Sequence, residues 1–165
     1  MVSETLEAKL NDLLNGELEA HHIYLQCAAW ASANKFEGAK SFLLLHATEE
    51  RGHMLKFFTF LDDLGAPISF KALEKPVIEA ANVRELFLRV QEEERKVSSH
   101  IYEAIHLARA EHSYEADQFL QWFAAEQHEE EKLCRQILDL IDLIGEGPNS
   151  NYLIDKELAG LAKAG

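Results

Sequence analysis

The chain has 165 residues, the size of one domain with a single core, so we expect one domain over residues 1–165. Its composition, 47% hydrophobic and 27% charged with 8 Gly and 3 Pro, excludes a disordered or fibrous protein. The excess of 29 acidic over 16 basic residues gives a formal net charge of -13, which argues against a nucleic-acid partner and favours cations.

Apolar residues recur at helical spacing along almost the whole chain, and no segment keeps the period of two that is typical of a strand. The first predicted helix covers about Thr5–Ala33. Asn34, with Glu37 three residues later, predicts a capping box that opens a second helix. We expect this helix to end at about Leu64, because Gly65 adopts the left-handed conformation after a helix at little cost.

Residues 65–82 form the one long predicted connection and contain two of the three prolines. Asn82 with Glu85 predicts a second capping box, which opens a third helix that reaches about Glu111. After a short turn, a fourth helix continues to about Ile144.

A short amphipathic segment, Tyr152–Ala162, is predicted to close the chain as a fifth helix. Short links force neighbouring helices to run antiparallel, whereas the long connection can carry the chain back along the bundle. The sequence therefore predicts an all-α protein, a four-helix bundle with one long crossover and a short fifth C-terminal helix.

The sequence carries no sign of a membrane or secreted protein. No apolar run approaches the roughly 18 residues that a membrane span needs, and the amino-terminal segment is acidic and amphipathic, unlike a secretion signal. Cys27 and Cys134 lie far apart at positions where small core residues are expected. We therefore expect a cytoplasmic protein with no disulfide and no membrane partner.

The predicted inward stripe of each long helix is apolar at both ends and polar in the middle. Since the polar break falls near mid-length in all four helices, the four breaks are expected to meet at one height. The polar residues of the stripes are Glu17 and His21 on the first helix, His46, Glu50 and His53 on the second, Glu94 on the third, and Gln127 and Glu130 on the fourth.

Four carboxylates at one level of an apolar core predict a metal site. A buried carboxylate costs several kcal/mol unless it is paired or neutralised, and the stripes contain no Lys or Arg. Two divalent cations would balance the four negative charges. Glu50 and His53 lie three residues apart on one helical face, and a carboxylate with an imidazole suits iron, manganese or zinc better than calcium or magnesium.

Bundles with two carboxylate-bound irons carry a lone Glu on each of two helices and Glu-x-x-His on the other two. Here the fourth helix departs from that pattern, since it offers Gln127-x-x-Glu130. Gln127 would be a weak ligand or a hydrogen-bond donor to bound dioxygen. The residues assigned to the first ion are Glu17, Glu50 and His53, and those assigned to the second are Glu50 as a bridge, Glu94 and Glu130.

With these residues in place, the sequence resembles the bacterial non-haem ferritins over essentially its whole length. The resemblance includes the helix lengths, the long second connection, the terminal helix and the run FLQWFAAEQHEEEKL. It implies a ferritin-like fold and a homo-oligomeric shell of two dozen subunits. It also implies a ferroxidase, which oxidises Fe(II) with dioxygen or peroxide and stores ferric mineral.

The family's site residues can be carried across position by position. The implied ferroxidase centre, with two irons, falls on Glu17, Glu50, His53, Glu94, Gln127 and Glu130, with Tyr24 beside it. The implied third iron site falls on Glu49, Glu126, Glu129 and Glu130.

Related classes match less well. A bacterioferritin would carry its haem-binding Met directly after the bridging Glu, where this chain has Arg51, so we expect no haem. Rubrerythrins need two Cys-x-x-Cys motifs, which are absent here. The small DNA-protecting relatives lack the terminal helix.

Several of these residues also have ordinary structural interpretations. Tyr24 fits a core tyrosine with a satisfied hydroxyl, and Trp122 fits simple packing. The acidic run 126–131 would ordinarily be a solvated face. Among the other histidines, His46, one turn from Glu50, is the candidate ligand, and Asp117 aligns roughly with a residue that lines the three-fold pores of some ferritins.

Two alternative functions remain open at this point. One is a shell-forming structural subunit with an idle metal site, and the other is a soluble di-iron oxidoreductase or peroxidase that stores no mineral. The oligomeric state distinguishes the soluble di-iron enzyme from a ferritin. The rate of iron oxidation distinguishes the shell with an idle metal site from a ferritin.

Overall fold

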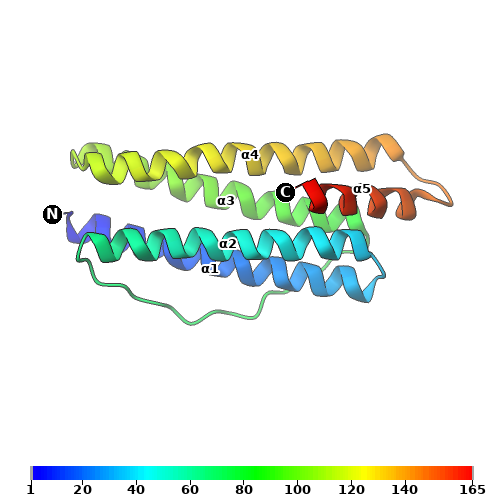
Figure 1. Ribbon diagram of the computed structural model, residues 1–165, viewed down its shortest axis with the longest axis horizontal. Helices are drawn as coiled ribbons and strands as arrows, with labels where there is room; N and C mark the ends of the chain where they lie inside the picture. The colour runs from blue at the N-terminus through cyan, green and yellow to red at the C-terminus, as the bar shows by residue number, and fades with distance from the viewer. Residues whose placement is uncertain (1, 165) are drawn as a thin grey trace.

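The computed structural model describes residues 2–164, most of which lie in four long helices and one short one (Figure 1). The helices are α1 (Glu4–Ala33), α2 (Glu37–Asp63), α3 (Val83–Ala110), α4 (Tyr114–Ile144) and α5 (Ser150–Ala164). Helix α1 packs along α2, α3 packs along α4, α1 also contacts α3, and α5 packs mainly against α2. The predicted bundle with one crossover and a fifth helix is confirmed. Within residues 2–164, no helix is long and apolar enough to cross a membrane.

The second predicted capping box is present and the first is wrong. The Asn82 side-chain oxygen accepts a hydrogen bond from the Glu85 amide at 2.9 Å and so caps α3. Asn34, in contrast, ends α1, where its side-chain nitrogen donates to the Trp30 carbonyl at 2.9 Å, and Lys35 adopts a φ of 68°. An Asn between two helices can serve the end of one or the start of the next, and here the left-handed Lys35 separates it from α2.

Helix α5 supplies the cap that α2 lacks in its own sequence. The N-cap residue of α2 is Phe36, which has no side-chain acceptor. The Asp155 carboxylate of α5 instead accepts a hydrogen bond from the Ala39 amide at 2.9 Å. This close approach depends on Gly38, because a Cβ at that position would overlap the backbone carbonyl oxygen of Asp155.

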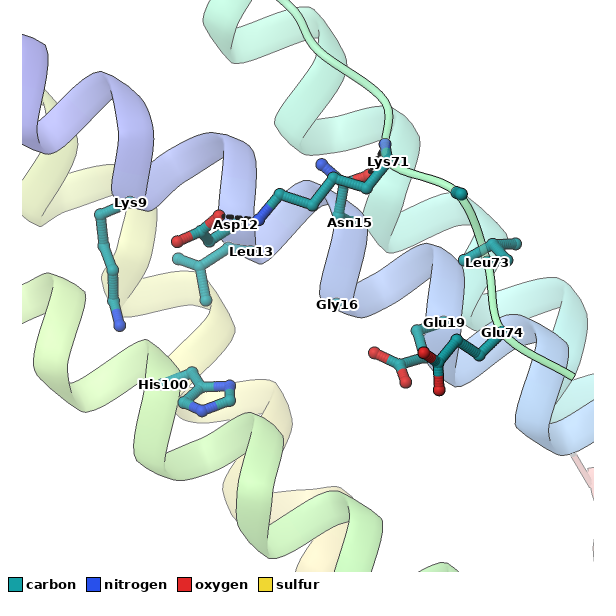
Figure 2. Close-up of a pocket in the computed structure, with 11 residues that line it drawn as sticks. Lys9, Asp12, Leu13, Asn15, Gly16, Glu19, Lys71, Leu73, Glu74 and His100 are labelled. Atoms are coloured by element: carbon teal, nitrogen blue, oxygen red, sulfur yellow. Dashed lines mark hydrogen bonds and ion pairs between the residues drawn. The ribbon is translucent and has the colours of Figure 1, made fainter. Parts of the chain in front are cut away.

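The crossover between α2 and α3 is fastened to α1 by two asparagines. Asn11 donates to the Pro67 carbonyl at 2.8 Å and accepts from the Ser69 amide at 2.8 Å. One turn later, Asn15 donates to the Ser69 carbonyl at 2.8 Å and accepts from the Lys71 amide at 2.7 Å. Figure 2 shows Lys71 reaching from the crossover across α1 toward Asp12. The long connection is therefore an ordered strap along the bundle.

The core is divided into two apolar clusters by a polar layer. The cluster nearer α5 includes Ile23, Cys27, Phe42, Phe87, Cys134, Ile137 and Leu158. The other cluster includes Leu6, Leu10, Phe57, Ile101, Leu120 and Phe123. Both cysteines are buried and free, as expected. The buried polar side chains from the middle of the four long helices lie between the clusters, as the inward stripes predict.

We expect Gly38→Ala to weaken the docking of α5. Forcing a methyl group against the Asp155 backbone should lower the free energy of unfolding by about 1–3 kcal/mol. Gly52→Ala in the same helix is the matched control, because a Cβ at Gly52 meets nothing within 4 Å. That control should raise the free energy of unfolding by about 0.5–1 kcal/mol. Chemical denaturation measures both, and equal stability of the two variants would contradict the role of Gly38.

Candidate metal centre

The four long helices each contribute to one buried polar layer. None of the six residues assigned to the paired ions exposes more than 7% of its surface. The pairs Glu50 with His53 on α2 and Gln127 with Glu130 on α4 are each three residues apart, so each pair projects from one helical face. The six residues are Glu17 from α1, Glu50 and His53 from α2, Glu94 from α3, and Gln127 and Glu130 from α4.

Glu17, Glu50 and His53 form the first of two clusters of candidate ligands. One ligand atom from each lies within 4.8 Å of the others. The His53 Nδ1 atom is 3.2 Å from Glu50 Oε2 and 3.7 Å from Glu17 Oε2. Both oxygens of Glu17 and Oε1 of Glu50 are buried without a hydrogen-bond partner among the described residues. Since buried polar atoms are almost always paired, these three oxygens fit a bound cation.

Glu94 differs from Glu17 because its carboxylate is satisfied by the protein. Its Oε1 atom accepts a hydrogen bond from the Tyr24 hydroxyl at 2.6 Å. Its Oε2 atom accepts one from Gln127 Nε2 at 3.0 Å. Tyr24 is therefore a buried core residue whose hydroxyl has a hydrogen-bond partner, as expected, and that partner is a candidate metal ligand.

A second cluster gathers around His46, which sequence reasoning treated only as a candidate. His46 Nδ1 is 3.1 Å from Glu49 Oε2 and 3.5 Å from Glu130 Oε2, yet within residues 2–164 this atom forms no hydrogen bond. The ring is held against Phe42, at 4.2 Å between centroids. The three-residue spacing from His46 to Glu49 could have revealed this cluster, because it repeats the spacing from Glu50 to His53.

The other two residues assigned to the third iron site lie apart from that cluster. Glu126 Oε1 is 3.9 Å from His53 Nε2, and its side chain is about one-third exposed. Glu129 is exposed and pairs with Lys132 at 3.2 Å. The structure thus brings Glu49 and Glu130 together and places Glu126 at the rim beside His53.

Trp122 does more than pack against its own helix. Its ring lies edge-on to the His53 ring, with centroids 5.5 Å apart. Its outer face carries the Lys56 ammonium, 4.3 Å from the ring centroid. Trp122 thus covers the solvent side of His53. Asp117 accepts a hydrogen bond from Arg109 at 3.1 Å.

Burial sets the protonation of the layer. It raises the pKa of Glu50 from 4.5 to about 8, with His53 acting against this and the charge of Glu17 acting with it. Burial and the charge of Glu50 also raise the pKa of Glu94 to about 8. Burial lowers the pKa of His53, but Glu17 and Glu50 outweigh it and raise that pKa to about 10. The metal-free layer therefore holds protons that a cation would displace.

Comparison with known proteins gives one consistent family. The ferritin family model, described as a ferritin-like domain, matches residues 7–144. A Haemophilus influenzae protein named "Probable bacterial non-heme ferritin-like protein" is 40% identical over 162 residues, which make up 98% of each chain. A "Bacterial non-heme ferritin" from Escherichia coli is 39% identical over 161 residues, again 98% of each chain. Among solved structures, an open pore ferritin from Archaeoglobus fulgidus superposes with a TM-score of 0.93 at 31% identity, over 96% of this chain and 98% of the other.

The raised pKa values predict that the metal-free protein loses stability as the pH rises. In the unfolded chain Glu50 and Glu94 release their protons near pH 4.5, but in the folded protein they keep them to about pH 8. The folded state binds more protons throughout this range, so the free energy of unfolding falls as the pH increases. His53, whose pKa is raised from 6.5 to about 10, acts in the same direction at higher pH.

Between about pH 5.5 and about pH 8.5, we expect each buried carboxyl to contribute more than about 1 kcal/mol to this loss. Glu94→Gln removes one titrating group, so its thermal midpoint should depend less steeply on pH than that of the unmodified protein. Glu92→Gln, at an exposed position of the same helix, is the control and should keep the original slope. An unchanged slope in Glu94→Gln would show that the buried carboxyl is not the source.

Proposed function

The chain belongs to the bacterial non-haem ferritins, and from this premise we propose that it oxidises Fe(II) within each bundle and stores the ferric product inside a shell of its own copies. The observation that carries the proposal is the set of buried, unpartnered oxygens of Glu17 and Glu50 beside His53. An apolar core gives such oxygens no stable partner other than a cation or a proton. We place this activity in the cytoplasm, which suits two free cysteines.

In this proposal the two Fe(II) ions are substrates, and binding the second ion disrupts more hydrogen bonds of the protein than binding the first. Glu17, Glu50 and His53 hold the first ion. Both oxygens of Glu17 and one of Glu50 are free, so this ion displaces only protons and the contact from His53 to Glu50. The second ion must compete with the hydrogen bonds that Tyr24 and Gln127 give to Glu94. We therefore expect the first position to fill before the second. The ligands of the second ion are Glu50 as a bridge, Glu94 and Glu130, with Gln127 beside them.

The reaction balances as a two-electron step. Each Fe(II) gives one electron, and dioxygen takes both electrons and two protons to become hydrogen peroxide. Hydrolysis of the two ferric ions then releases protons to solvent. The anionic carboxylates stabilise the higher charge of Fe(III), and the apolar clusters above and below the layer keep bulk water away from the reaction.

We propose a third iron position at the second cluster, with His46 as an additional ligand beside Glu49 and Glu130. The unpartnered, buried His46 Nδ1 atom supports this assignment. Glu126 and Glu129 stand nearer the surface, where they would pass iron between this position and solvent.

The assembly proposed is a homo-oligomeric shell of two dozen subunits. The likeness to ferritins over almost the full length of each chain supports it. A net charge of -13 per subunit would concentrate Fe(II) near such a shell and bind the first mineral nuclei.

Anaerobic loading with Fe(II) followed by air tests the oxidation step. We expect a rapid rise of visible absorbance from Fe(III), slowed more than about tenfold in Glu50→Ala, because Glu50 serves both ions. Glu129→Ala is the matched control, because it removes the same negative charge from an exposed position. In the first turnover this variant should oxidise iron nearly as fast as the unmodified protein. Equal oxidation rates in the unmodified protein and Glu50→Ala would contradict the proposal and indicate a shell-forming subunit whose metal site is idle.

Size-exclusion chromatography with light scattering tests the assembly. We expect a particle of about two dozen copies of the 18.7 kDa chain, and an electron-dense core after iron loading. A monomer or dimer that still oxidises iron would instead indicate a soluble di-iron oxidoreductase that stores nothing.

A further inference from the structure

The orientation of the Gln127 amide is set by acceptors on α3, which belong to the metal ligand Glu94 and to Ser98, a residue outside the ligand set. Within residues 2–164, all three hydrogen bonds of the Gln127 side chain use Nε2. The acceptors are the Glu94 backbone carbonyl at 3.2 Å, Glu94 Oε2 at 3.0 Å and Ser98 Oγ at 3.4 Å. The nitrogen of this amide is therefore turned to α3, which leaves its carbonyl oxygen on the opposite side of the amide carbon.

Two of the three acceptors make this orientation obligatory. A backbone carbonyl can only accept, so a flipped amide would place two oxygens about 3 Å apart with no proton between them. The Glu94 carboxyl group is less decisive, because it can donate a hydrogen bond when it is protonated. Ser98 therefore provides the second fixed acceptor.

Ser98 accepts from Gln127 because its own proton is committed elsewhere. Its Oγ atom donates to Glu131 Oε1 at 2.6 Å, and Ser98 is buried while Glu131 is partly exposed. A hydroxyl has one proton, so the Glu131 carboxylate leaves Ser98 Oγ with only lone pairs to offer to Gln127. Glu131 thus orients the Ser98 hydroxyl, and the Ser98 hydroxyl in turn orients the Gln127 amide.

We propose that Ser98 and Glu131 are positioning residues that hold the Gln127 amide with its nitrogen on α3, so that Gln127 offers an oxygen atom to the second metal position. This inference rests on the proposed function, because it assigns a task at the paired metal centre. It also favours the ligand role of Gln127 over the donor role, since both hydrogens of the amide nitrogen have acceptors on α3.

Anaerobic titration of the metal-free, full-length protein with Co(II), followed by visible absorption, tests this role without any oxidation chemistry. Unmodified protein should fill the two positions of the paired centre in two steps, and a third, separate step is expected from the cluster around His46. In Ser98→Ala we expect the second step to weaken by about threefold to tenfold, the effect of losing one buried hydrogen bond, and the first step to stay unchanged. Glu131→Ala should shift the second step in the same direction, because it frees the Ser98 proton to point at Gln127.

Two variants control for simple damage to the bundle. Ser98→Thr keeps the hydroxyl and should restore the second step, and Ser99→Ala, at the exposed neighbouring serine, should leave both steps unchanged. A second step in Ser98→Ala equal to that of the unmodified protein, or an equal loss in both steps, would overturn the positioning role alone. Unmodified protein that binds fewer than two Co(II) per subunit would overturn the paired metal centre and this role together.

Discussion

Mutual repulsion of carboxylates confined to one layer of an apolar bundle governs how the centre of this protein is built. Among residues 2–164, both oxygens of the buried Glu17 and one oxygen of the buried Glu50 lack a hydrogen-bond donor. In water such groups are stabilised by solvent, but between two apolar clusters only a proton or a metal ion can compensate them. The layer is unfavourable for folding, but the same uncompensated negative charge favours the binding of a transition-metal cation.

The carboxylates of this layer differ in their hydrogen bonding, and the roles proposed for them differ accordingly. Glu94 is held by Tyr24 and Gln127, whereas both oxygens of Glu17 lack a hydrogen-bond donor in the described part of the chain. A position with free oxygens binds an ion with little rearrangement, and a position with engaged oxygens binds one only after exchanging hydrogen bonds for coordination. The proposed order of loading rests on this asymmetry, and so does the proposed role of Ser98 in keeping the amide of Gln127 in one orientation.

Much of the fold was predictable from sequence because its signals are local and repeated. The helical spacing of apolar residues, the Asn82 cap and the mid-helix polar breaks each predict a feature that the structure contains. The predicted cap at Asn34 failed because nothing local reveals that Asp155, far along the chain, caps α2. The spacing from His46 to Glu49 indicates that these two side chains share a helical face. The approach of Glu130 to His46 and the hydrogen bond from Ser98 to Glu131 instead depend on contacts between helices, whose side-chain geometry no spacing rule supplies.

Anomalous diffraction at the iron edge, from crystals soaked anaerobically in Fe(II), would locate the bound ions. We predict two strong peaks per subunit inside the bundle, one among Glu17, Glu50 and His53 and the other between Glu50, Glu94 and Glu130. Iron found only on the outer acidic faces, with no density in the buried layer, would contradict it.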